Sequence, residues 1–194
     1  MCSSDLLHRQ LGRTVIHVTH DQVEAMTMGE RICIMNQGRI VQTGPPMEVY
    51  RNPADTFVAG FLASPPMNLL DADAARHAVV VGGIPIPLRE SDHRTFATLH
   101  DHRVIVGIRP EDLSTEPRPD SVSLDLRVVA IEALGPEVIL IASLPDGREL
   151  AARMGRDFTA PVGSERRLYL DPAAIHLFDP ATTRAIRRDG RSHP

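Results

Sequence analysis

The chain has 194 residues, 42% of them apolar, which is enough for one medium domain or two small ones. Its formal net charge of −4 and its 4% aromatic residues do not favour a nucleic-acid binder, which needs clustered cations and stacking surfaces. All 21 basic residues are arginine, so the chain cannot contain a Walker A loop, whose phosphate contact requires a lysine.

Signals for disulfides, membranes and metals are sparse. The two cysteines, Cys2 and Cys33, do not indicate a disulfide framework. No apolar run approaches the ~20 residues of a membrane-spanning helix, and no hydrophobic signal-peptide region follows Met1. No HExxH or CxxC motif occurs, so no metal site is predicted. We therefore expect a soluble, intracellular protein.

The first third of the chain mixes short strands and helices. Val15–Val18 is apolar and β-branched, which is typical of a buried strand. Asp21, with Glu24 three residues later, forms a variant capping box that predicts the start of a helix. Asn36-Gln37-Gly38 is a turn signal between two apolar runs and predicts a hairpin. The expected strands are at 15–18, 31–35 and 39–43, and the expected helices at 21–28, 46–50 and 54–62.

From about Ala63 the chain changes character. Ser64-Pro65-Pro66 is typical of a linker, and short segments of alternating apolar and polar residues follow it. Pro85 and Pro87 favour an edge position for one strand, and Asp146-Gly147 predicts a tight hairpin turn. Short strands at this spacing are typical of a small closed or partly closed barrel. They are predicted at 79–81, 84–88, 104–108, 122–133, 138–144, 149–154, 167–170 and 175–178.

His20 occupies the position where the first predicted strand gives way to a helix. Ligands of α/β sheets bind at the carboxyl ends of the strands, where an imidazole can donate to a phosphate oxygen or orient a water. A single histidine in this place is more often structural than functional. His17 lies three residues earlier, but a strand-to-loop segment does not present the two as a metal-binding pair. Both interpretations of His20 stay open on these residues alone.

Several short blocks then add a family resemblance. They are Gly12-Arg13-Thr14, VTHDQVEAM at 18–26, QGRI at 37–40, Asn52-Pro53-Ala54, FVAGF at 57–61, SPPMN at 64–68, GIRPE at 107–111 and HLFD at 176–179. In this order they closely resemble the ATP-binding subunits of ABC importers, in the branch that takes up carbohydrates and glycerol-3-phosphate. The last two blocks resemble the C-terminal TOBE or MOP-like barrel of that branch. The resemblance extends from about Leu7 to Ile186.

The resemblance implies an α/β remnant of a P-loop nucleotide-binding domain followed by an all-β OB-like (TOBE/MOP) barrel. It places the C-terminal part of the nucleotide-binding domain at 7–62 and the TOBE/OB-like regulatory domain at 63–186, with a frayed tail at 187–194. We interpret residues 1–6 as an artefactual start, because their codons can spell the end of a common sequencing adapter. The alternative is a natural start of the gene.

The same resemblance implies that His20 is the switch histidine, which contacts the γ-phosphate of ATP. The Walker A, glutamine-loop, signature and Walker B segments of the family have no counterpart in this sequence. ATP and Mg are therefore expected as cofactors of the intact parent, an ABC-type transport ATPase. This fragment is not expected to bind them tightly or to be active alone. For Arg109, Glu111 and Phe178, we expect a buried arginine–carboxylate pair and a core aromatic rather than a functional role.

The implied partners are a second copy of the subunit, membrane permease subunits and, indirectly, a solute-binding protein. The implied location is the cytoplasmic face of the membrane, and the implied cargo is a sugar, a polyol or glycerol-3-phosphate. Two alternatives stay open. One is a stand-alone regulatory or oxyanion-binding barrel, which calorimetry with molybdate would reveal. The other is nucleic-acid binding, which the acidic charge and few aromatics disfavour.

Overall fold

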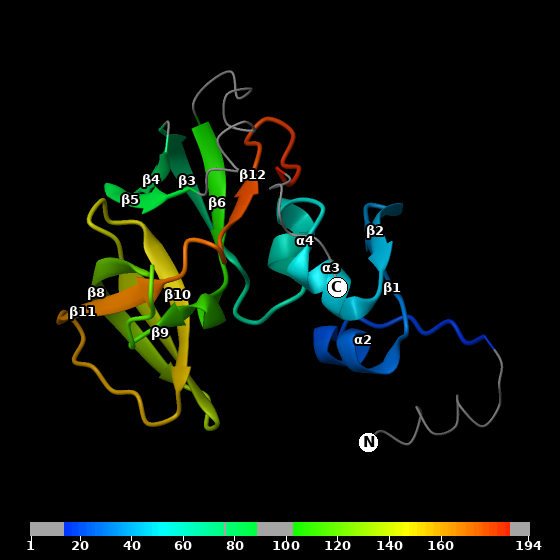
Figure 1. The fold of residues 1–194 in the computed structure, drawn as a ribbon. Coiled ribbons are helices and arrows are strands. Elements are labelled where there is room, and N and C mark those ends of the chain that lie inside the picture. Colours follow the sequence, from blue (N-terminus) through cyan, green and yellow to red (C-terminus); the bar gives the residue numbers. More distant parts are fainter. Residues whose placement is uncertain (1–13, 76, 89–102, 187–194) are drawn as a thin grey trace. The chain divides into compact units, whose positions relative to one another are not determined.

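The computed structural model describes residues 14–75, 77–88 and 103–186. The chain divides into two compact units, Met1–Ala63 (unit 1) and Ser64–Pro194 (unit 2), which are described separately (Figure 1). No helix among the described residues is long and apolar enough to cross a membrane. The predicted start at 1–6, the predicted tail at 187–194 and Cys2 lie outside the described residues.

Unit 1 contains a β-hairpin and three short helices. Its elements are α2 (Gln22–Met28), β1 (Ile32–Asn36), β2 (Arg39–Gly44), α3 (Pro46–Arg51) and α4 (Thr56–Phe61). Strands β1 and β2 pair antiparallel, and Gln37 and Gly38 in the turn between them have positive φ angles of 47° and 75°. The predicted hairpin and helices are confirmed. Helix α4 begins later than expected because Asp55 is its N-cap, with the side chain accepting from Val58 N at 2.9 Å.

A small apolar core holds unit 1 together. Ile32 and Ile34 are buried on one side of β1, as the period of two in a strand requires. They belong to one cluster with Val49 of α3, Val58 of α4 and Leu62. The hairpin and the two short helices therefore stabilise one another through this cluster.

The predicted strand at Val15–Val18 is wrong. The segment has no regular secondary structure, and Ile16 and Val18 are 90% and 89% exposed. A strand persists only where a neighbouring strand pairs its backbone N–H and C=O groups, and within residues 14–63 the only ladder joins β1 to β2. For the same reason, the described part of unit 1 does not show the parallel sheet of a P-loop α/β domain.

Unit 2 is built from two five-stranded antiparallel sheets. One has the order β12-β6-β3-β4-β5 and the other the order β10-β9-β8-β11-β7. The strands are β3 (Asn68–Ala74), β4 (Ala78–Val81), β5 (Ile84–Pro87), β6 (Arg103–Ile108), β7 (Leu113–Ser114), β8 (Val122–Ala133), β9 (Glu137–Ser143), β10 (Glu149–Gly155), β11 (Glu165–Leu170) and β12 (His176–Phe178). The 3-10 helix η2 (Pro110–Asp112) connects β6 to β7.

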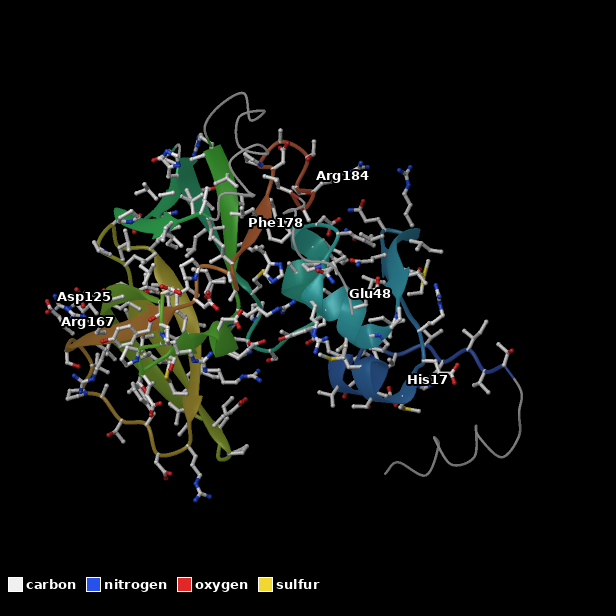
Figure 2. All side chains as sticks on the ribbon, in the orientation of Figure 1. His17, Glu48, Asp125, Arg167, Phe178 and Arg184 are labelled. Carbon is white, nitrogen blue, oxygen red and sulfur yellow. The ribbon has the colours of Figure 1, made fainter. Side chains whose placement is uncertain are left out.

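One apolar core is shared by both sheets. Strand β8 shows how the sequence builds it, because Leu124 and Leu126 are buried while Asp125 between them is exposed. On that exposed face, the Asp125 carboxylate accepts from Arg167 Nε of β11 at 2.7 Å (Figure 2). The alternation in the sequence therefore separates the core of unit 2 from its solvated surface.

The eight predicted strands of unit 2 are confirmed, and so are two of the predicted details. Strand β5, with Pro85 and Pro87, lies at a sheet edge, where a proline costs no ladder hydrogen bond. Gly147 has a φ of 86° in the tight turn between β9 and β10. Strand β3 was not predicted because its aspartates and alanines are poor strand formers, although Leu70 and Ala72 alternate inward. The two-residue strand β7 was not predicted either.

Candidate functional site

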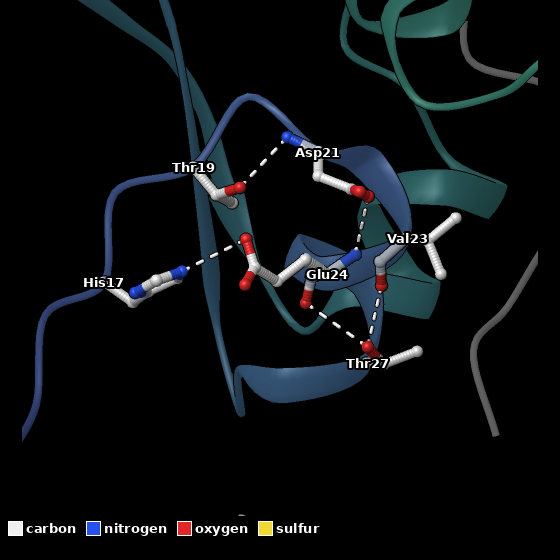
Figure 3. A network of polar contacts seen from close by, with 6 residues as sticks. All are labelled: His17, Thr19, Asp21, Val23, Glu24 and Thr27. Atoms are coloured by element: carbon white, nitrogen blue, oxygen red, sulfur yellow. Dashed lines mark hydrogen bonds and ion pairs between the residues drawn. The ribbon is translucent and has the colours of Figure 1, made fainter. Parts of the chain in front are cut away.

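A network of polar side chains surrounds the bend that leads into α2 (Figure 3). Asp21 is the N-cap of the helix, and its Oδ1 accepts from the backbone N of Glu24 at 3.0 Å. Thr19 Oγ1 accepts from the backbone N of Asp21 at 3.0 Å. His17 Nε2 lies 3.1 Å from Glu24 Oε2. The Thr19 side chain thus closes the backbone turn before α2, and the Asp21 side chain caps the first turn of the helix.

Glu24 has a role that the capping-box prediction did not give it. In a capping box, the glutamate would reach back to the backbone N of Asp21, but Thr19 Oγ1 already accepts from that group. The Glu24 carboxylate instead interacts with the side chains of Thr19 and His17, and these hydrogen bonds lower its pKa from the ordinary value. Glu24 therefore remains an anion and links the extended segment at His17 to α2.

His20 lies at the bend itself, between Thr19 and Asp21, and its side chain is exposed. It is not a member of the network drawn in Figure 3, so its neighbours are fixed while the imidazole remains accessible. Such a group can donate to an anionic oxygen that approaches the N-terminal side of α2. The strand expected before His20 is absent, but the helix expected after it is present.

The three barrel residues singled out in the sequence have different environments. Phe178 of β12 is fully buried, which confirms a core aromatic. Arg109 is 5% exposed and precedes η2, so a buried arginine is also confirmed. Glu111 lies in η2 and is exposed, which means that the carboxylate of the expected buried pair is at the surface.

The residues that the sequence analysis missed near His20 are Thr19 and Glu24 in their observed roles. The signal for Thr19 was available, because a hydroxyl two residues before a backbone N–H commonly closes a local turn. The pairing of Glu24 with His17 had no such local signal. It depends on the direction in which the segment before the bend leaves the helix.

Family models match unit 2 along most of its described length. The "MalK OB fold domain" matches residues 64–113, and the "TOBE domain" matches residues 106–178. Two antiparallel sheets around a shared core and these two matches define unit 2 as an OB-like TOBE domain. A solved structure of the molybdate-binding protein ModG aligns with 58% of this chain and 96% of that protein, with a TM-score of 0.49 and 13% identity.

Curated relatives cover both units. An "sn-glycerol-3-phosphate import ATP-binding protein UgpC" of a Jannaschia species is 43% identical over 89% of this chain and 47% of the relative. The "Sulfoquinovosyl glycerol transport ATP-binding protein SmoE" of Agrobacterium fabrum is 40% identical over 93% of this chain and 50% of the relative. The "Multiple sugar-binding transport ATP-binding protein MsmK" of Streptococcus mutans is 40% identical over 93% of this chain and 52% of the relative.

The chain matches the C-terminal part of the ATP-binding subunits of carbohydrate and glycerol-3-phosphate ABC importers. It spans about half the length of the curated relatives that it matches.

Proposed function

We propose that this chain works as the C-terminal part of an ATPase subunit that energises the import of a sugar, a polyol or glycerol-3-phosphate. The observation that carries the proposal is the match of 89–95% of the chain to subunits of that description. In this assignment, residues 7–62 are the end of a P-loop nucleotide-binding domain, and residues 63–186 form its OB-like regulatory domain.

His20 is the residue that contacts the γ-phosphate of ATP in the complete subunit. Its exposed imidazole, at a bend held by Thr19 and Asp21, supports this role. Phosphoryl transfer depends mainly on positioning and on stabilising the charge of the transferred group. A donor fixed at the γ-phosphate serves both needs, because it orients the attacking water and neutralises developing charge.

The rest of the complete subunit supplies the other nucleotide contacts. A triphosphate with Mg is held by the backbone amides and lysine of a phosphate loop, and this sequence contains no lysine. We therefore expect the present chain to show neither tight binding of ATP and Mg nor ATP hydrolysis by itself.

The partners follow from the same assignment. The complete subunit forms a homodimer and docks on membrane permease subunits at the inner face of the cytoplasmic membrane. A solute-binding protein outside the membrane acts on it indirectly. The names of the relatives, which describe import and transport ATP-binding proteins, support these partners.

A chimera tests the role of His20. The N-terminal half of the Jannaschia relative is joined to residues 14–194 of this chain, and ATP hydrolysis and nucleotide binding are measured separately. His20→Ala should lower kcat by roughly 10²–10³, the usual cost of removing one donor to a transition-state oxygen, with nucleotide binding retained. Val23→Ala is the control, because it shortens a 71% exposed apolar side chain at the start of α2 and leaves the side-chain contacts of Thr19, Asp21 and His17 in place.

Two results would refute the proposal. A His20→Ala chimera that hydrolyses ATP as fast as its parent removes the γ-phosphate role. Steady ATP turnover by the unmodified chain, purified to homogeneity, contradicts the assignment of the remaining catalytic groups to another part of the subunit.

A further inference from the structure

The block Ser64-Pro65-Pro66-Met67-Asn68 is the first segment of unit 2, and the nucleotide chemistry gives it no role. Its last residue makes an unusual set of contacts for a side chain. Asn68 Nδ2 donates to Ile108 O at 3.0 Å and to Ala151 O at 2.8 Å, while Asn68 Oδ1 accepts from Ala151 N at 2.7 Å. The amide of Asn68 thus pairs with both backbone groups of Ala151, as a neighbouring strand would.

Two arginines make parallel contacts on either side of Asn68. Arg153 Nη2 donates to Ser64 O at 2.6 Å, and Arg148 Nη1 donates to Asp71 O. Along the two segments, 64, 68 and 71 therefore meet 153, 151 and 148 in antiparallel order. We call these six residues the seam: Ser64, Asn68, Asp71, Arg148, Ala151 and Arg153.

Side chains make the seam where no backbone ladder joins the two strands. Asn68–Asp73 of β3 pair with β6 on one side, β4 pairs only with Asp73 and Ala74, and β10 is the edge strand of the other sheet. An edge strand leaves every second backbone N–H and C=O without a ladder partner, and a buried backbone group without a partner is costly. Asn68 satisfies both groups of Ala151, and it also joins the two sheets of unit 2.

The remaining members give the seam its position. Arg153 is held by Glu137 of β9, whose Oε2 lies 3.2 Å from its Nε. Arg148 is held by Asp146, whose Oδ2 lies 2.6 Å from its Nε. Each guanidinium group thus contacts a carboxylate of β9 or of the turn between β9 and β10, and this contact orients it toward the carbonyl group of Ser64 or Asp71. A carbonyl oxygen with a charged donor makes a stronger contact than one with a neutral donor.

We propose that the seam is a strap that fastens the segment entering unit 2 to the edge strand β10, with Asn68 setting its register and Arg153 holding its first residue. Ser64 directly follows the last residue of unit 1 in the chain. The strap therefore holds the first residue of unit 2 against β10.

Amide hydrogen exchange of the full chain, followed by NMR, tests the strap. Asn68→Leu keeps the size of the side chain and removes both its donor and its acceptor. We expect exchange at the Ala151 amide to become at least tenfold faster, while amides of β8 keep their rates. Arg153→Met should shift the carbonyl carbon resonance of Ser64, which loses its charged donor, and leave the Ala151 amide protected, because it releases only the first contact of the seam.

Two controls separate the strap from general stability. Arg156→Met removes an exposed arginine that pairs with the exposed Asp157. It should change neither the exchange rate of the Ala151 amide nor the carbonyl carbon resonance of Ser64. Glu137→Gln removes the ion pair of Arg153 but keeps its contact with Ser64, so the carbonyl carbon resonance of Ser64 should shift less than in Arg153→Met.

Unchanged protection of Ala151 in Asn68→Leu, or an equal rise in exchange across β8 and β10, would overturn the role of Asn68. If Asn68→Leu does not fold, the Arg153→Met variant decides, and an unchanged carbonyl carbon resonance of Ser64 would overturn the strap. Because the seam lies within unit 2, neither outcome depends on nucleotide binding.

Discussion

Replacing Gly107 by alanine should destabilise unit 2, because the added methyl group has no space. Gly107 lies in β6 between Leu69 of β3 and His176 of β12. A Cβ at this position would collide with Met67 Sδ and lie 3.0 Å from Phe178 Cε2 and 3.1 Å from His176 Cβ. The glycine of the GIRPE block is therefore explained by close packing of three neighbouring side chains.

The magnitude follows from which neighbours can move. Met67 is a flexible side chain and can turn aside, but Phe178 is fully buried and His176 presents its Cβ, which is fixed to the strand backbone. Overpacking of a well-packed core typically costs 1–3 kcal/mol, and Gly→Ala recovers about 0.4–1 kcal/mol from the unfolded chain. We expect a net loss of about 1–2 kcal/mol in the free energy of unfolding.

Tyrosine fluorescence in urea gives a readout of unit 2 alone. The chain has no tryptophan and two tyrosines, Tyr50 in unit 1 and Tyr169 in unit 2. In a Tyr50→Phe background, the signal comes from Tyr169 of β11. With a slope of about 2 kcal/mol per molar urea, in the usual range for a small protein, the expected loss lowers the midpoint by about 0.5–1 M.

Gly155→Ala is the matched control, because no atom lies within 4 Å of its added Cβ. It should leave the midpoint unchanged or raise it slightly. The double variant Gly107→Ala with Met67→Ala should be less destabilised than the sum of the two single variants, since Met67→Ala removes the nearest neighbour of the new methyl group. A midpoint for Gly107→Ala equal to that of the parent would refute the packing argument.

Two further predictions concern single polar contacts. Asp21→Ala should remove the cap of α2 at a cost of about 0.5–2 kcal/mol to that helix, seen as faster exchange of the Glu24 amide; an unchanged rate would contradict the cap. The hydrogen bond from Arg167 lowers the pKa of Asp125 from the ordinary 3.8, so the contribution of this pair to stability is present above that value and is lost as the pH falls through the lowered pKa. Asp125→Asn should therefore flatten the acid dependence of the unfolding midpoint, and an acid dependence equal to that of the parent would contradict the role of this pair.

Local chemistry allowed the sequence to determine many elements by itself. The Gln37-Gly38 and Asp146-Gly147 turns, the Asp21 cap and the alternation along β8 each depend on residues within a few positions of one another. Turn conformation, helix capping and the period of two in a strand are all set at that range. The hairpin of unit 1 and the eight predicted strands of unit 2 were predictable for this reason.

Near His20, the sequence predicted the position at the start of α2 but not the contacts around it. The apolar segment Val15–Val18 has strand propensity, yet propensity gives no pairing partner, and the described residues provide none. Glu24 meets the capping-box pattern, but Thr19 accepts from the backbone group that the pattern assigns to it. Pairing and competition among hydrogen-bond partners are properties of the folded chain.

The seam was decided only by the tertiary structure. Asn68 reaches backbone groups 40 and 83 residues farther along the chain, and Arg153 reaches back 89 residues to Ser64. No local pattern records such distances, because they arise when two sheets close around a shared core and leave one edge strand to be paired by side chains. The sequence supplies an asparagine shortly after two prolines, and the fold makes it one of the contacts that join the two sheets.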